Sequence, residues 1–408
     1  MCLSSGVMRT HSLSIAFASV ILFAWPICTI AQESRDVGAL IARLNDDDKR
    51  VREDAAEGLA EILDSRIPPL LRNRIAEETD FHVKLALHYA LASQGDKQAL
   101  QFLIDSLRQT GHMGANYLGY ATPEDYEWKI DQWQKWFDKT SDQEFLAFIR
   151  ERRKRKPMME EWSEFASLYG KRFLGSLTNA ETGEPAGFVD RMTKEEIRRL
   201  SELPTAEAWN LFESAIDQLQ DKGNRKESAR LFRKIATEFS NTYYADESKE
   251  LADLLEKMVA EDAEYTPPID IASLEIDQQI DFHIHNLRDV VAHQFSQPGD
   301  CRVLSQLRLS DDERYNAAGS LRDIGKPAIP RLISLLDDRR PIRAVGYWRD
   351  FHPTRTVLRY QDAAIQIIEA IQAGSPYDRR TTSSYFSTER PETQKAVIES
   401  LKSSAKSK

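Results

Sequence analysis

The stretch with the clearest capacity for binding chemistry runs from Arg339 to Arg359, where six arginines and no lysine occur. The aromatic side chains interleaved with these arginines are Tyr347, Trp348, Phe351 and His352. A planar guanidinium group pairs bidentately with carboxylate, phosphate or sulfate and stacks on aromatic rings. This composition predicts a site for an acidic peptide or an anionic polymer. The candidate residues are Arg343, Tyr347, Trp348, Arg349, Arg355 and Arg359.

The same arginines also have a structural interpretation, which the sequence leaves open. In that interpretation they pair with acids of their own segment and pin an irregular loop onto the fold, while Trp348 fills a core pocket. The acids available for such pairs are Asp337, Asp338, Asp350 and Asp362. A binding loop and a pinned loop therefore both remain possible at this stage.

A second group of residues, Asp281, His283, His285 and His293, has the composition of a metal site. Two histidines at i and i+2 share one side of a strand but diverge by about 200° on a helix. The surrounding apolar residues have helical spacing and predict one continuous helix: Ile276, Ile280, Ile284, Leu287, Val291 and Phe295. We therefore expect surface histidines and no metal. A metal-dependent hydrolase using His283 or His352 is the minor alternative.

The chain lacks the sequence signatures of common catalytic sites. G-x-S-x-G, H-E-x-x-H, G-x-G-x-x-G and the phosphate-binding G-x-x-x-x-G-K-[ST] are all missing from the sequence. The sequence therefore predicts a protein that is not an enzyme and needs no cofactor.

The first 31 residues differ in composition from the rest of the chain. Arg9 precedes a long apolar run, and the small residues Thr29 and Ala31 stand at the −3 and −1 positions of a cleavage site. We expect a signal peptide cleaved after Ala31 and export to the periplasm or the exterior. An uncleaved N-terminal anchor is the alternative.

Charge and cysteine content narrow the classes of partner. The chain has 55 Lys and Arg against 65 Asp and Glu, a formal net charge of −10. Nucleic acid is therefore not expected as a partner, because phosphate binding requires a basic surface.

Cleavage after Ala31 would leave Cys301 as the one cysteine, so no intramolecular disulfide is expected. No later segment is apolar for long enough to span a bilayer.

Two distant regions share one sequence pattern. With a constant offset and no gap, Ala55, Ala56, Leu59, Ile62, Ile67, Pro68 and Leu70 align with Ala317, Ala318, Leu321, Ile324, Ile329, Pro330 and Leu332. Adjacent alanines let two helices approach closely, and proline is tolerated in the first turn of the next helix. A further unit starts at Val83, 32 residues after Val51. The sequence therefore predicts repeated pairs of helices.

This pattern resembles HEAT-type repeats, over residues 36–136 and 311–371. The resemblance implies a helical solenoid and no shared catalytic residue. The alanine pair at Ala317 recurs at Ala363, 46 residues later, so the C-terminal array contains an insertion. The insertion falls within the arginine-rich stretch, where Pro341, Gly346 and Pro353 indicate a structured loop.

The middle of the chain interrupts these repeats. "RERRKRKP" is expected to end a helix at Pro157, and residues 157–204 to form a linker. Residues 205–262 contain three predicted helices, separated at 222–224 and 240–241, whose apolar spacing resembles tetratricopeptide repeats. So few units cannot bury their own apolar faces, and we expect them to dock on the neighbouring array.

The predicted fold is all-α, a helical-repeat solenoid of HEAT-like arrays with a tetratricopeptide-like insert. The expected divisions are a signal peptide (1–31), an N-terminal array (32–156), a linker (157–204), tetratricopeptide-like helices (205–262) and a C-terminal array (270–408) with the insertion at 339–360. We expect an exported, non-catalytic scaffold that binds a protein partner. A binder of acidic or sulfated polysaccharide is the alternative.

Overall fold

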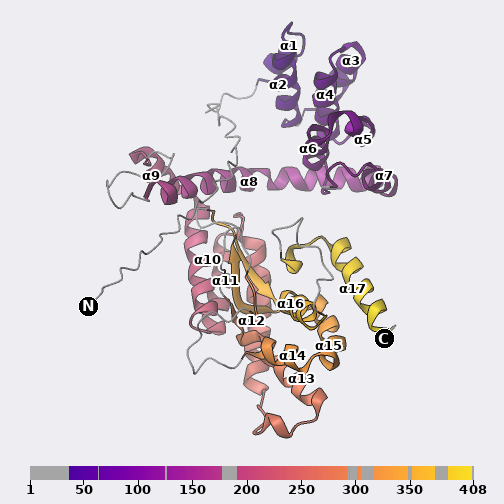
Figure 1. The fold of residues 1–408 in the computed structure, drawn as a ribbon. Coiled ribbons are helices and arrows are strands. Elements are labelled where there is room, and N and C mark those ends of the chain that lie inside the picture. Colours follow the sequence, from indigo (N-terminus) through magenta and orange to yellow (C-terminus); the bar gives the residue numbers. More distant parts are fainter. Residues whose placement is uncertain are drawn as a thin grey trace, which may run out of the picture. The chain divides into compact units, whose positions relative to one another are not determined.

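The chain forms two compact units, Met1–Arg153 and Lys154–Lys408 (Figure 1). The computed structural model describes residues 36–62, 64–124, 126–176, 191–292, 294, 301–304, 316–347, 352–372 and 385–406. The predicted signal peptide, residues 1–31, lies outside these ranges. No helix within them is long and apolar enough to cross a membrane.

The first unit is built from successive helices. They are α1 (Val37–Arg43), α2 (Lys49–Ala60), α3 (Ile67–Glu77), α4 (Phe81–Ser93), α5 (Ala99–Thr110), α6 (His112–Ala121) and α7 (Ile130–Lys139). Each of α1, α3 and α5 packs against the helix that follows it, and α4 packs against both α2 and α6. The unit is thus a stack of helix pairs, as the repeated pattern predicted.

The shared pattern occupies equivalent positions in the two units. Ala55 and Ala56 are fully buried in α2, and Ala318 is fully buried in α14 (Ala317–Ile324). Proline stands in the first turn of the helix that follows, at Pro68 in α3 and at Pro330 in α15 (Ile329–Ser334). The missing N–H of proline costs no hydrogen bond there. The predicted position of proline in the first turn of the following helix is confirmed at both sites.

The predicted linker at 157–204 is partly wrong. Helix α8 runs from Asp142 to Ser176 with Pro157 inside it, and α9 occupies Lys194–Glu202. Proline lacks the backbone N–H that would donate to a carbonyl oxygen of the preceding turn. Because Pro157 is exposed, water can donate to that carbonyl instead. The charge block before Pro157 therefore does not end the helix.

Three helices begin the second unit after α9. They are α10 (Pro204–Gln220), α11 (Arg225–Glu238) and α12 (Ala245–Glu264), and α11 packs against both of the others (Figure 1). Their boundaries match the predicted breaks, and Phe212 and Phe232 are fully buried between α10 and α11. The tetratricopeptide resemblance of these helices stays a prediction.

The remainder of the second unit contains helices and a small sheet. Its helices are α13 (Ile276–His285), α14, α15, α16 (Tyr360–Gln372) and α17 (Pro391–Lys406), with short 3₁₀ helices at Ile271–Ser273, Asn286–Asp289, Lys326–Ala328, Leu335–Asp337 and Phe386–Thr388. Its strands are β1 (Val291–Ala292), β2 (Pro341–Tyr347) and β3 (Arg355–Arg359), in the order β1-β2-β3. Strand β1 is parallel to β2, and β3 is antiparallel to it, with Val345 opposite Val357.

The three-stranded sheet differs from the sequence-based prediction in two places. The insertion at 339–360 is not a loop throughout, because β2 and β3 pair within it. The predicted helix through Val291 ends earlier, since α13 stops at His285 and Val291 pairs with Arg343 in the sheet. Val291 and Ala292 form a strand because pairing with β2 outweighs the helical spacing of the local apolar residues.

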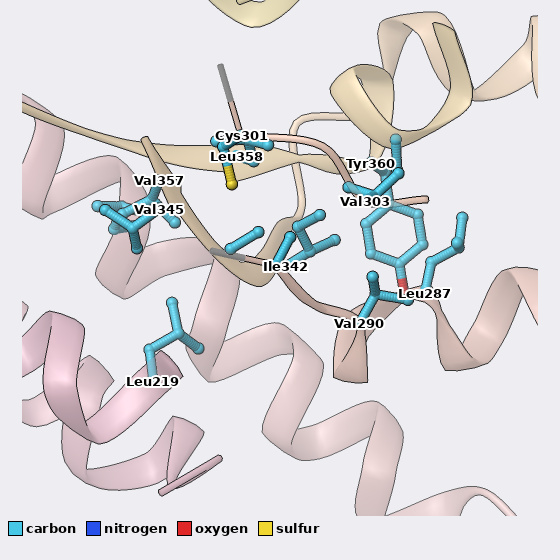
Figure 2. Packing of buried hydrophobic residues seen from close by; sticks show 14 of the residues in the cluster. Leu219, Leu287, Val290, Cys301, Val303, Ile342, Val345, Val357, Leu358 and Tyr360 are labelled. Carbon is cyan, nitrogen blue, oxygen red and sulfur yellow. The ribbon is translucent and has the colours of Figure 1, made fainter. Parts of the chain in front are cut away.

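One hydrophobic core unites the second unit. Figure 2 shows Leu219 of α10 in the same cluster as Ile342, Val345 and Val357 of the sheet, with the fully buried Cys301 close to Leu358. The three helices α10–α12 therefore bury their apolar faces against the C-terminal array, as predicted. The core of the first unit is a separate cluster made from residues between Leu44 and Ile149.

Candidate functional site

Four of the six predicted binding residues lie on β2 and β3 of the sheet. We call residues 339–360 the arginine segment. Arg343 and Tyr347 belong to β2, and Arg355 and Arg359 belong to β3. Trp348 and Arg349 lie outside the described residues, so the structure places four of the six candidates.

Arg343 caps the C-terminal end of α10. Its Nε and Nη2 donate to the carbonyl oxygen of Gln220 at 3.0 and 2.8 Å, and its Nη2 donates to that of Asp221 at 3.3 Å. Gly223 permits this approach, because its φ is +60° and a Cβ there would lie 3.1 Å from Arg343 Nη1. The last carbonyls of a helix lack intrahelical donors, so a cation there is stabilising. Arg343 thus ties β2 to α10.

Arg355 occupies an aromatic and acidic environment within the second unit. Its guanidinium carbon lies 5.1 Å from the ring centroid of Trp209 and 5.3 Å from that of Tyr347. Its Nε is 3.2 Å from Oε1 of Glu213, and its side chain is 14% exposed. Burial raises the pKa of Glu213, and the charge of Arg355 opposes that rise. This arrangement combines cation–π contact with an ion pair.

Arg359 is almost fully enclosed, with 4% of its surface exposed. Its Nη1 donates to the carbonyl oxygen of Arg339 at 3.1 Å, and its Nη2 lies 3.8 Å from Oε2 of Glu250. Arg339 donates twice to the same Glu250 carboxylate on α12. Two arginines of the segment therefore converge on one glutamate.

The acids expected to pair with the arginines have mixed roles. Asp338 pairs with Arg340 at 2.6 Å. Asp362 instead accepts backbone N–H groups, from Arg359 at 2.7 Å and Ser387 at 2.8 Å. Asp350 lies outside the described residues. Glutamates of α10 and α12, which the sequence did not suggest, supply the carboxylates for Arg355 and Arg339.

These contacts give Arg343, Arg355 and Arg359 partners within their own chain. Their donors join the sheet to α10 and α12. Binding of an external anion by the arginine segment stays a prediction.

The histidine group does not converge in the described residues. His283 is 7% exposed, and burial lowers its pKa. The ring of His285 stacks on Tyr265, with centroids 3.5 Å apart. His293 lies outside the described residues. Within the part of the chain that the structure describes, no three His, Cys, Asp or Glu side chains are grouped to hold a metal ion.

A second surface lies on α2, α4 and α6 of the first unit. The ring of Tyr89 stacks on Tyr117 with centroids 5.0 Å apart and lies 6.4 Å from the ring of Tyr120. His82 Nδ1 is 3.3 Å from Met113 Sδ. We call this surface the tyrosine face. Its exposed or half-buried residues are Glu53 and Glu57 of α2, His82 of α4, and Met113 and Tyr120 of α6, and the buried residues Tyr89 and Tyr117 contact them.

The glutamates of the tyrosine face interact with its tyrosine side chains. Tyr117 donates its hydroxyl to Oε1 of Glu57 at 2.7 Å, across 60 residues of sequence. Burial raises the pKa of Tyr117, and the hydrogen bond and charge of Glu57 and the charge of Glu53 add to this. Burial also raises the pKa of Glu53, as does the neighbouring Glu57. Two carboxylates thus lie partly desolvated beside tyrosine rings.

The tyrosine face also exposes apolar surface. Tyr120 is 50% exposed and Met113 is 40% exposed. Nearby, Trp128 is 52% exposed and meets the ring of His112 edge to face, with centroids 4.9 Å apart. Large exposed apolar side chains gathered in one place mark binding surfaces.

Sequence reasoning missed this surface. The available signal was the spacing of Met113, Tyr117 and Tyr120, which puts them on one side of a helix. Spacing alone does not distinguish an exposed stripe from a buried one.

Family comparisons agree with the helix pairs. A family model described as HEAT repeats matches residues 37–112, and one described as PBS lyase HEAT-like repeat matches residues 313–338. The chain contains HEAT-like repeats. The first match extends from α1 to the start of α6, and the second includes α14 and α15. Together the matches cover about a quarter of the chain. No curated protein matches the sequence.

Proposed function

We propose that this protein is an exported, non-catalytic scaffold that binds a protein partner through the tyrosine face of its N-terminal HEAT-like repeats. HEAT repeats commonly mediate protein interactions, which supports a binding role. The N-terminal composition, with its apolar run and the cleavage pattern ending at Ala31, supports export.

The observation that carries this proposal is the exposure of Tyr120 and Met113 beside the stacked pair Tyr89 and Tyr117. Tyrosine supplies a large and rigid contact area with a polar tip, which is why it is enriched in protein interfaces. The exposed Tyr120 ring lies 6.4 Å from that of Tyr89, which is buried and stacked on Tyr117. A side chain beside such a rigid pair loses little conformational freedom on binding.

The arginine segment supports the polysaccharide alternative less well. Arg343, Arg355 and Arg359 already donate to acceptors of α10, α12 and the sheet. An external anion would have to compete with these contacts. We therefore place the protein-binding function on the tyrosine face.

Site-specific photo-crosslinking tests this function. A photoreactive benzoylphenylalanine would be introduced at position 120 of the full chain, and at position 108 as the control, since Arg108 is exposed on α5. Both variants would be illuminated in native cell-envelope extract, and the adducts identified by mass spectrometry. We expect one protein to crosslink at position 120 and not at position 108.

The crosslinked protein should also bind the purified chain directly. We expect Tyr120→Ser to weaken that binding by roughly tenfold, the effect of losing one central aromatic contact. Equal crosslinking at both positions, or none at position 120, would contradict the proposed function.

A further inference from the structure

We infer that the tyrosine face recognises an arginine-bearing segment of its protein partner, which rests on the proposed function of that face. The inference follows from two properties of one face, the half-buried carboxylates of Glu53 and Glu57 and the exposed ring of Tyr120. A guanidinium group is complementary to both at once. The buried Tyr117, on the same helix as Tyr120, donates its hydroxyl to Glu57.

The carboxylates supply the first half of the complementarity. Glu53 and Glu57 are half-buried neighbours on α2, one helical turn apart. Burial disfavours ionisation of Glu53, and the charge of Glu57 adds to this. A cation placed between α2 and α6 would relieve that repulsion, because an opposite charge stabilises a carboxylate. The free protein therefore has a site where positive charge lowers the free energy.

The tyrosine rings supply the second half. Tyr120 exposes half of its surface, and its ring lies 6.4 Å from that of the buried Tyr89, which stacks on the buried Tyr117. Guanidinium groups stack on aromatic faces and keep in-plane donors free for carboxylates. An ammonium group is not planar and cannot stack flat on a ring while it pairs bidentately with a carboxylate, so arginine is the better occupant than lysine.

The same chemistry already operates within the second unit. Arg355 is held by the rings of Trp209 and Tyr347 while it pairs with Glu213. The tyrosine face offers aromatic rings and glutamates in the same combination. In this case the arginine would come from the partner.

Short fluorescent peptides provide the direct test. One peptide alternates arginine with leucine, and a matched peptide carries citrulline, which has the shape of arginine without its charge, in place of each arginine. Binding of both to the full chain would be measured by fluorescence anisotropy. We expect the arginine peptide to bind about tenfold more tightly than the citrulline peptide, as charge-assisted contacts do relative to neutral ones.

Variants of the chain then locate the binding. We expect Glu53→Gln and Tyr120→Ser each to weaken binding of the arginine peptide by about fivefold or more. Asp105→Asn removes the same charge from an exposed position on α5 and should leave binding unchanged. Thermal melts of each variant would show that folding is intact.

The outcomes separate this inference from the proposed function. Equal binding of the two peptides, or an unchanged affinity in Glu53→Gln, would overturn the arginine inference. If a protein still crosslinks at position 120 and Glu53→Gln leaves its yield unchanged, the face binds a partner by other chemistry. If no protein crosslinks at position 120, the proposed function itself fails.

Discussion

Among the described residues of the first unit, the most enclosed carboxylate is that of Glu78, which is 3% exposed. Arg52 donates to it twice, at 2.9 and 3.1 Å, and Arg74 once, at 2.7 Å. The backbone N–H groups of Thr79 and Asp80 donate to Oε1 at 2.9 Å each. Burial alone would raise the pKa of Glu78, but the bonds from Arg52 and the backbone outweigh it, so the pKa is lowered.

This lowered pKa predicts an acid-sensitive contribution to stability. A carboxylate with a depressed folded-state pKa stabilises the fold above its unfolded value, near 4.5, and loses that contribution as the pH falls through the folded value. We expect Glu78→Gln to lower the free energy of unfolding by about 2 to 4 kcal/mol at pH 7, because two arginines lose their counter-charge. The loss should shrink below about pH 4. Urea unfolding across this range measures it, and a cost independent of pH would contradict the argument.

At the residue scale, the sequence predicted which side chains were unusual but not which ones they contact. The arginines between Arg339 and Arg359 stood out from composition alone. Their partners Glu213 and Glu250 are far away in sequence, on α10 and α12. Such pairs depend on how helices pack onto the sheet, and local spacing carries no information about that.

At the scale of elements, the β2–β3 hairpin depends on one glycine. A Cβ at Gly346 would lie 1.8 Å from the hydroxyl oxygen of Tyr385 and 2.2 Å from its Cζ. That hydroxyl also accepts the backbone N–H of Cys301 at 3.3 Å. The ring of Tyr385 thus occupies the space that any side chain at position 346 would need.

We therefore predict that Gly346→Ala lowers the free energy of unfolding by about 3 kcal/mol or more, because overpacking forces the strand or the ring to move. Tyr385→Ala should also destabilise, by about 2 kcal/mol, through lost packing. The double variant should cost at least about 1 kcal/mol less than the sum of the two, since each change removes the clash with the other. Chemical denaturation of the three variants measures this coupling. Additive effects would show that the two positions are independent.

Helices could be predicted from the sequence where a local residue pattern marks their position. Adjacent alanines and first-turn prolines located α2, α3, α14 and α15. The hairpin was missed because β2 and β3 gain their register from each other and from the Arg343 contact with α10, and local sequence does not encode these pairings. Helix α8 was cut short in prediction, because Pro157 usually ends a helix but is tolerated at an exposed position.

At the scale of the whole molecule, the two units have separate hydrophobic cores. The buried cluster of the first unit contains residues from Leu44 to Ile149, and that of the second contains residues from Trp162 to Leu401. No residue belongs to both clusters. Cooperative unfolding follows the extent of a core, so each unit should unfold as its own cooperative block.

A buried arginine of the second unit, Arg288, allows a test of whether the two units unfold separately. Arg288 is 2% exposed and pairs with Glu261 at 2.8 Å and with Asp262, both on α12. Its Nε donates to the carbonyl oxygen of His285 at 2.9 Å. These contacts join the segment after α13 to α12. The pair of Arg331 and Asp281, by contrast, is exposed on both sides.

Separate cores predict two calorimetric transitions that substitutions move independently. Arg288→Ala should lower the stability of the second unit by about 3 kcal/mol, because it removes a buried side chain that joins two helical segments and leaves a cavity. The exposed control Arg331→Ala should cost less than about 1 kcal/mol. Glu78→Gln should move the transition of the first unit and leave the other in place. If Arg288→Ala and Glu78→Gln shift the same transition by comparable amounts, the two cores unfold together, and stability is shared along the whole chain.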